Sequence, residues 1–283
     1  MDGPMTGPAA APAQIPAHPP GTVRHRISAA KLNQHQLDGY REAIRQAGQF
    51  SSGDNRGFQW FAGQHGIPGN FCQHHVQSEH GRRFFLPWHR AYLYFFELAL
   101  QDLVPDVTQP WWDWTFDPQN PTWIPDVYGV ATLPGGAPNP LFSQPINVRP
   151  PRPGQPPATV RAHSGPDPRV QPTQDQLTAL LNEGDFFTFS LEVENIHDGI
   201  HGATGGTMAN IAWAAYDPIF FAHHTMIDRL WSMWQDLHGA PGPTQDMLGE
   251  ALPPWAMTVQ QTLDVGNLGY SYAATSVRVP GTP

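Results

Sequence analysis

The chain has 283 residues, of which 40% are hydrophobic, and this length and composition suit one domain with a sizeable core. Its formal net charge of −9 argues against nucleic acid or an anionic membrane surface as a partner, and no apolar run is long enough to cross a bilayer. The single cysteine, Cys72, excludes an intrachain disulfide framework. The 27 glycines and 32 prolines indicate long irregular loops around a compact centre.

Residues 1–22 are rich in proline and alanine and lack the basic segment and the apolar stretch of a signal peptide. We expect them to form a disordered tail, and residues 23–283 to form a single domain. The protein is accordingly expected to be cytoplasmic, or to be exported with the aid of a helper protein.

Helical periodicity begins behind Asn33, a suitable N-cap, where apolar residues recur at steps of three and four. These residues are Leu37, Tyr40, Ile44 and Ala47. A second, shorter helix is expected over residues 58–65. A third is expected to start at Pro87 and to end before Pro105, because apolar side chains again follow a helical spacing there.

Residues 111–114 form a dense aromatic segment that is expected to pack inside the protein. From Asp117 to about Asp185 the chain is rich in proline and glycine, with a short helical pattern only near residues 174–181. A stretch of that length without its own structure is normally functional or mobile. We interpret it as loop packed around the core.

Two further helices are predicted in the last third of the chain. The segment 186–201 is helical towards its end, and a helix over residues 217–237 begins with Asp217 as N-cap and Pro218 at the first helical position. The tail from residue 252 onwards shows some β character.

Histidines recur on these predicted helices. His223 and His224 lie inside an apolar helix, where a buried imidazole needs a partner. His197 and His201 are four residues apart, so both imidazoles project from one helix face. We therefore expect a bound group between these two helices.

A second set of histidines lies upstream, with His65 at the end of one predicted helix and His80 and His89 around the start of the next. His74 and His75 compete with His65 and His80 for a place in this set. Three neutral imidazoles in each set make an open metal site with room for an exogenous ligand.

The donor type selects the metal. Four helices with inward-facing ligands describe a mainly α protein, a four-helix bundle that carries metal. Di-iron and di-manganese bundles use glutamates, whereas an all-imidazole set favours copper, zinc or nickel. Two Cu(I) ions can together supply two electrons to dioxygen, while zinc has no redox chemistry. The expected cofactor is therefore a pair of copper ions.

These segments resemble the type 3 dinuclear copper family, which contains tyrosinase, catechol oxidase and haemocyanin. Residues 80, 85–90 and 92–97 look like the family's first copper region, and residues 217–220, 223–224 and 228–231 look like its second. Residues 112–114 and 205–208 also lie where the family has similar segments. The resemblance covers roughly residues 22–273.

By this resemblance, His65, His80 and His89 bind the first copper, and His197, His201 and His224 bind the second. The nine-residue step from His80 to His89 matches the family, whereas the steps from His74 or His75 do not. In the pair His223–His224 the family uses the second histidine as ligand and places the first behind it.

The resemblance also implies a water held by a carboxylate beside the second copper. Glu194 precedes His197 and Asp198 follows it, with Glu192 as the alternative to Glu194. Such a water can take the proton of a phenol. Clear monophenol hydroxylases usually have asparagine where this chain has Asp198, which leaves monophenol hydroxylation open.

Some family members link a cysteine two residues before the second ligand to that histidine by a thioether. Ser78 occupies that position here, and Cys72 instead precedes His74 by two residues. We therefore expect Cys72 to be a free thiol.

Residues 269–272 resemble the tyrosine motif that closes the family's catalytic domain, with Arg24 or Arg26 as its partner. Asp228 is expected to orient its helix through Arg229 or the backbone. The expected protein is a bacterial short form without a C-terminal shielding domain, whose site needs no proteolysis to become accessible.

The resemblance implies a copper oxidase that uses dioxygen to convert o-diphenols to o-quinones, of the tyrosinase or polyphenol oxidase type. An o-aminophenol oxidase of secondary metabolism and a haemocyanin-like oxygen-binding protein are the alternatives. The expected partners are a phenolic substrate, dioxygen and a separate protein that helps to load copper.

Overall fold

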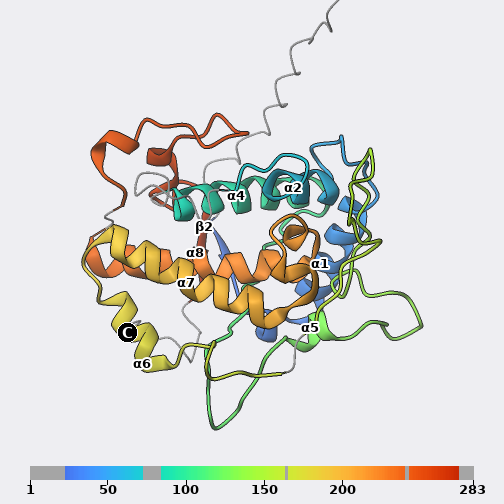
Figure 1. Cartoon of the computed structure of the whole chain (residues 1–283), viewed down its shortest axis with the longest axis horizontal. Coiled ribbons are helices and arrows are strands. Elements are labelled where there is room, and N and C mark those ends of the chain that lie inside the picture. The colour runs from blue at the N-terminus through green and yellow to red at the C-terminus, as the bar shows by residue number, and fades with distance from the viewer. Residues whose placement is uncertain (1–22, 73–83, 163–164, 240–241, 274–283) are drawn as a thin grey trace, which may run out of the picture.

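The computed structural model describes residues 23–72, 84–162, 165–239 and 242–273 (Figure 1). The predicted tail, residues 1–22, and the candidate ligand His80 lie outside these ranges. The described chain is mainly helical, which confirms the predicted fold class. No helix within it is both long and apolar enough to serve as a membrane span.

The α-helices of the described residues are α1 (Gln34–Ala47), α2 (Phe58–His65), α4 (Phe85–Leu103), α5 (Asp126–Gly129), α6 (Gln174–Leu181), α7 (Phe186–Thr204) and α8 (Pro218–His238). Short 3₁₀ turns lie between them: η1 (Ala29–Lys31), η2 (Gly206–Ala209), η3 (Ala214–Tyr216), η4 (Gln245–Met247) and η5 (Val259–Thr262). The strands are β1 (Arg24–Arg26) and β2 (Tyr270–Tyr272).

The helix ends follow local chemistry. Asn33 and Gln36 form a reciprocal capping box at the start of α1, and the Asp217 side chain accepts a hydrogen bond from Ile219 N at the start of α8. Helix α4 begins at Phe85, two residues before the predicted start at Pro87. The proline is tolerated because N–H groups in a first turn have no partner within the helix.

Helices α4, α7 and α8 contact one another at the centre of the molecule, and α7 and α8 lie side by side (Figure 1). Helix α2 packs against η3 and reaches α4 through the Tyr92 hydroxyl, which donates to Phe61 O at 2.8 Å. The four predicted histidine-bearing helices therefore meet around one region.

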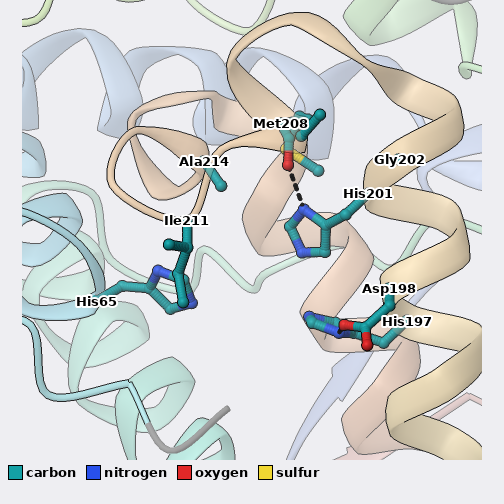
Figure 2. A pocket seen from close by; sticks show the side chains of 9 residues that line it. His65, His197, Asp198, His201, Gly202, Met208, Ile211 and Ala214 are labelled. Carbon is teal, nitrogen blue, oxygen red and sulfur yellow. Dashed lines mark hydrogen bonds and ion pairs between the residues drawn. The ribbon is translucent and has the colours of Figure 1, made fainter. Parts of the chain in front are cut away.

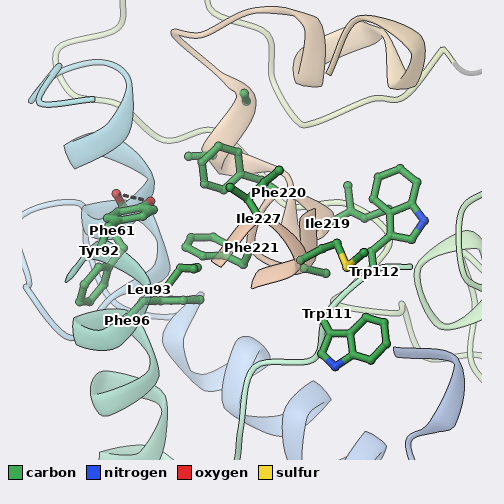
Figure 3. Close-up of a cluster of buried hydrophobic side chains, with 14 of the residues drawn as sticks. Phe61, Tyr92, Leu93, Phe96, Trp111, Trp112, Ile219, Phe220, Phe221 and Ile227 are labelled. Carbon is green, nitrogen blue, oxygen red and sulfur yellow. Dashed lines mark hydrogen bonds between the residues drawn. The ribbon is translucent and has the colours of Figure 1, made fainter. Parts of the chain in front are cut away.

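Aromatic side chains fill the space between α2, α4 and α8 (Figure 3). The ring of Phe221 stacks on Phe96 with centroids 3.9 Å apart and on Tyr92 at 5.7 Å. Each buried aromatic ring removes a large apolar area from water and restricts how its neighbours slide. This packing sets the register of α4 against α8, and hence the distance between the histidines that the two helices carry.

The long loop between residues 117 and 185 is packed on the core, as the sequence predicts. Tyr128, Leu141, Ile146 and Val148 of this loop are buried in the hydrophobic core. Gln59 of α2 donates to Pro145 O at 2.7 Å and accepts from Asn147 N at 3.0 Å. Side-chain hydrogen bonds thus replace regular secondary structure in this region.

The two ends of the described chain meet in a buried network of charges. β1 pairs with β2 in parallel, with Arg26 opposite Tyr272. The carboxylate of Asp228 accepts hydrogen bonds from Arg26 Nη1 at 3.2 Å, Arg90 Nε at 2.5 Å and the hydroxyls of Tyr270 at 2.7 Å and Tyr272 at 2.5 Å. Of the two arginines that the sequence offered, Arg26 therefore binds the tyrosine motif.

Asp228 was expected to orient its helix through Arg229 or the backbone, and the part of this expectation that concerns Arg229 is wrong. The guanidinium of Arg229 lies instead over the ring of Trp111, 4.3 Å from its centroid. Because α8 turns by about 100° per residue, adjacent side chains face different neighbours, and only Asp228 faces Arg26 and Arg90.

We predict that Asp228→Asn lowers the free energy of unfolding by about 3–5 kcal/mol at neutral pH, because it leaves the buried Arg90 without its paired carboxylate and removes one of the two carboxylates that Arg26 binds. Burial raises the pKa of Asp228, but Arg90 and Arg26 outweigh it and hold that pKa below its usual value. A depressed carboxyl pKa stabilises the fold above the unfolded pKa of about 3.9 and loses that contribution as pH falls through the folded value. As the pH falls below about 4, the free energy of unfolding should therefore decrease less in the variant than in the wild type, and the difference between the two proteins should shrink.

Urea unfolding of the two proteins between pH 3 and pH 7 measures both effects. Asp106, whose side chain is 92% exposed, supplies the matched control Asp106→Asn. An equal loss in both variants would contradict the prediction.

Candidate metal centre

Three imidazoles meet between α7 and α8. The Nε2 atom of His224 lies 3.2 Å from Nε2 of His197 and 3.3 Å from Nε2 of His201. His197 and His201 are one turn apart on α7, and His224 lies two turns into α8. The structure therefore brings the three members of the second predicted set together.

The other ring nitrogen of two of these histidines is used as a donor. His197 Nδ1 lies 3.0 Å from a carboxylate oxygen of Asp198, and His201 Nδ1 lies 2.8 Å from Met208 O (Figure 2). Both acceptors require a proton on Nδ1, so in the neutral rings each Nε2 carries a lone pair. Both lone pairs face the Nε2 atom of His224.

The spacing of the three nitrogens fits a metal ion. Metal–imidazole bonds of about 2.0–2.1 Å in a tetrahedral arrangement place neighbouring nitrogens roughly 3.3–3.4 Å apart. Burial first, and then the neighbouring histidines, hold the pKa of His224 well below its usual value. The ring is consequently neutral, as a metal ligand must be.

The structure also separates His224 from its neighbour His223. The indole N–H of Trp114 donates to His223 Nδ1 at 3.0 Å, and burial holds the pKa of His223 well below its usual value. The neutral His223 therefore carries its proton on Nε2 and has no ring lone pair left for a metal. Trp111, Trp112 and Trp114 are buried in the core, as predicted for a packing segment.

The described members of the first set are His65 at the end of α2 and His89 on α4. Their ring centroids are 5.7 Å apart, and His89 Nδ1 lies 2.7 Å from Phe85 O, which leaves Nε2 as the electron-pair donor. The competitors His74 and His75 lie outside the described residues, as does His80.

Cys72 is a free thiol whose Sγ lies 3.6 Å from His89 Nε2. Burial raises the pKa of this thiol well above its usual value, and the charges of Glu194 and Asp198 add to the effect. The group therefore remains protonated. His74, two residues further on, lies outside the described residues, so the expected absence of a thioether stays a prediction.

The two sets are adjacent. The rings of His89 and His224 stack with centroids 4.4 Å apart, and His65 lies 5.9 Å from His224. Helix α2 delivers His65 to this place because Gly66 follows it: a Cβ at Gly66 would lie 2.4 Å from Ala212 O. Only glycine permits so close an approach between the end of α2 and the segment before η3.

A cavity of about 280 Å³ opens onto the imidazoles (Figure 2). His65 faces His201 and His197 across it. It is lined by His65, His197, Asp198, His201, Gly202, Met208, Ala209, Ile211 and Ala214. The walls are thus largely apolar, with one carboxylate beside the nitrogens.

The two predicted carboxylates differ in their placement. Asp198 lines the cavity and binds the ring of His197, whereas Glu194 is buried one turn earlier on the same face of α7. The alternative, Glu192, is exposed. Three contacts of the histidines were not predicted from the sequence: the acceptor Met208 O, the donor Trp114 and the Asp198–His197 bond. Residues 205–208 and 112–114 were identified only as segments that resemble the family.

The fold and the site define a helical protein with two adjacent sets of imidazoles, the arrangement of a dinuclear metal centre. Residues 55–237 match the family model described as the common central domain of tyrosinase. The chain therefore belongs to the tyrosinase family, as the sequence resemblance indicated. This family binds two copper ions, and the histidine clusters are positioned for such a pair.

Relatives include both enzymes and oxygen-binding proteins. Tyrosinase of Streptomyces glaucescens is 33% identical over 201 residues, which cover 60% of this chain and 72% of the relative. Hemocyanin 2 of Megathura crenulata is 30% identical over 239 residues, which cover 72% of this chain but only 7% of that much longer protein.

Solved structures repeat this division. Tyrosinase from Burkholderia thailandensis superposes with a TM-score of 0.74 at 22% identity, covering 92% of this chain and 76% of that one. A functional unit of octopus hemocyanin gives a TM-score of 0.71 at 24% identity, covering 88% and 68%. These likenesses establish the fold, which is shared by both kinds of protein.

We predict that His224→Ala lowers the copper content from about two ions per chain towards one, because the second set loses the nitrogen shared by its close contacts. Metal analysis after copper loading and dialysis measures the content. The exposed His35 on α1 supplies the control His35→Ala, which should keep the wild-type content. Full copper content in both variants would contradict the prediction.

Proposed function

We propose that this protein is a copper-dependent oxidase that uses dioxygen to convert o-diphenols to o-quinones. In this proposal His65, His80 and His89 hold one copper ion, and His197, His201 and His224 hold the other. The observation that carries the proposal is the cavity, which gives a small molecule direct access to His65 of the first set and to His197 and His201 of the second.

The size and lining of the cavity favour a single aromatic ring. Its volume of about 280 Å³ lies just below the range of about 300–1,000 Å³ for drug-sized ligands. Ile211, Met208 and Ala214 offer apolar walls, and Gly202 leaves open space where another residue would project a side chain. A flat ring with two adjacent hydroxyls fits such a site.

The copper pair, when bound, supplies the electron transfer between diphenol and dioxygen: two diphenols and one dioxygen give two quinones and two waters. The chain's own residues bind the ring, hold the ligand imidazoles and move protons. Asp198 fixes the orientation of His197 through the Nδ1 proton. Together with Glu194 it is proposed to hold a water that receives the hydroxyl proton of the substrate.

Oxygen binding without turnover is the second candidate function, favoured by the hemocyanin relatives. Dioxygen alone needs less room than the cavity provides, which supports the oxidase. Copper-reconstituted protein should consume oxygen steadily when catechol is added. Formation of oxygenated protein without consumption of catechol would identify an oxygen carrier.

A panel of tyrosine-like phenols, catechols and o-aminophenols determines the reaction further. An o-aminophenol has the same ring and nearly the same size as a catechol, so an o-aminophenol oxidase is an alternative within the same chemistry. The copper-loading helper protein remains a prediction.

We predict that Glu194→Gln lowers monophenol turnover at least about tenfold more than diphenol turnover, because a monophenol has to lose its proton before it can be hydroxylated. Oxygen uptake with matched monophenol and diphenol substrates measures the ratio. The exposed Glu192 supplies the control Glu192→Gln. Equal losses on both substrates would remove Glu194 from the proton transfer.

We predict that Gly202→Leu raises KM for catechols with a bulky ring substituent about tenfold and changes the KM for catechol itself much less. A Cβ at Gly202 meets no atom within 4 Å, so α7 accepts the new side chain, which then narrows the cavity. Gly202→Ala should give a smaller effect in the same direction. Unchanged KM values for the bulky substrates would place their binding elsewhere.

A further inference from the structure

A short segment of the long loop, residues 160–162, lies against both helices that carry the second set of histidines. We infer that this segment, called the brace below, holds α7 and α8 in the relative position that the second metal site needs. Arg161 is its positioning residue. The inference rests on the proposed function, since it concerns the metal site that the proposed function uses.

The backbone of the brace binds the end of α7 and the turn that follows it. Ala162 N donates to Thr204 O at 3.0 Å, and Thr207 N donates to Val160 O at 2.8 Å. The Thr207 hydroxyl adds a bond to Val160 O at 2.9 Å and accepts from Val160 N at 3.2 Å. A Cβ at Gly206, whose φ is 59°, would lie 2.1 Å from Val160 O. Glycine is therefore required for this contact.

This contact reaches a ligand ring through one further residue. Thr207 is followed by Met208, whose carbonyl oxygen accepts the Nδ1 proton of His201. The position of η2 thus determines where the His201 ring points. Because the brace holds Thr207 at three hydrogen bonds, it fixes the acceptor that orients His201.

The side chain of Arg161 binds the other helix. Its guanidinium makes a bidentate pair with Asp217, at 2.9 Å from Nε to Oδ2 and 2.5 Å from Nη2 to Oδ1. Both side chains are buried, with exposures of 6% and 0%. Asp217 is the N-cap of α8, two turns before His224. The arginine therefore ties the brace to the start of the helix that carries the third ligand.

The remaining donors of Arg161 anchor the brace to the rest of the long loop. Nη1 donates to Tyr128 O at 2.6 Å, and Nη2 donates to Leu141 O at 3.0 Å. A lysine keeps the positive charge but cannot form this planar fork. Since metal sites require ligands held within roughly 0.5 Å, loss of the fork should disturb the second site before it disturbs the fold.

Two variants test the inference from different sides. Arg161→Lys removes the fork but keeps the charge beside Asp217, and Gly206→Ala pushes η2 away from the brace without touching the ion pair. Arg152→Lys, at an exposed position of the same loop, is the matched control. Each protein is compared with the wild type in copper content, copper affinity and amide hydrogen exchange of the copper-free form.

In the copper-free form, the amides of Thr207 and Ala162 should lose protection about tenfold in Arg161→Lys, while those in the middle of α4 keep theirs. The inference is overturned if the Thr207 and Ala162 amides of the variant are as protected as in the wild type, or if the amides of α4 lose as much protection as they do. This measurement does not depend on copper, so it remains decisive if the wild type fails to bind two copper ions and the proposed function falls.

With copper, one of the two ions should bind about 10- to 100-fold more weakly in both variants. Double variants identify which ion. In the His201→Ala background, Arg161→Lys should cause little further loss of copper. In the His89→Ala background, it should weaken the binding of the remaining copper ion. Equal weakening in the two backgrounds, or wild-type affinity in Arg161→Lys and Gly206→Ala, overturns the inference.

Discussion

The metal centre depends on the convergence of three imidazoles from α7 and α8. The Nε2 atoms of His197 and His201 lie 3.2 and 3.3 Å from Nε2 of His224, so the three rings converge on one place. Protonation of His224 is opposed by burial and by its histidine neighbours. A metal cation can bind between these nitrogens, and the hydrogen bonds at the Nδ1 atoms of His197 and His201 fix the orientation of those two rings. The remaining structure serves to keep these rings in place.

Packing and hydrogen bonds both hold the rings in place, and they act on different parts of the centre. His89 is placed by packing, because the interlocked rings of Phe96 and Phe221 fix α4 against α8. His201 is placed by hydrogen bonds, through Met208 O and the turn that carries it. Packing resists sliding of whole helices, whereas a hydrogen bond selects one tautomer and one ring orientation. A pair of metal ions at short distance needs both.

The sequence predicted what local spacing determines. The helix over residues 34–47, its asparagine cap and the shared face of His197 and His201 all follow from 3.6-residue periodicity and capping chemistry. Contacts between distant segments were not predictable in this way. Asp228 was expected to act through its neighbour Arg229 or the backbone, but its partners are Arg26 and Arg90 from other elements. The donors and acceptors behind the rings, Trp114 and Met208 O, likewise depend on tertiary packing.

The long loop between residues 117 and 185 shows that a segment rich in proline and glycine can be more ordered than its composition indicates. Proline and glycine remove periodicity, so apart from the short helix over residues 174–181 this region offers no pattern from which its structure can be predicted. Its order comes from single side chains, among them Gln59 and Arg161, that bind several backbone carbonyl or amide groups at once. A loop held in this manner can be as well positioned as a helix, because each guanidinium or side-chain amide group restricts the conformation of several backbone segments at once. The metal-binding histidines that the structure describes therefore lie on the helices, and the precision of the second metal site depends in part on the loop.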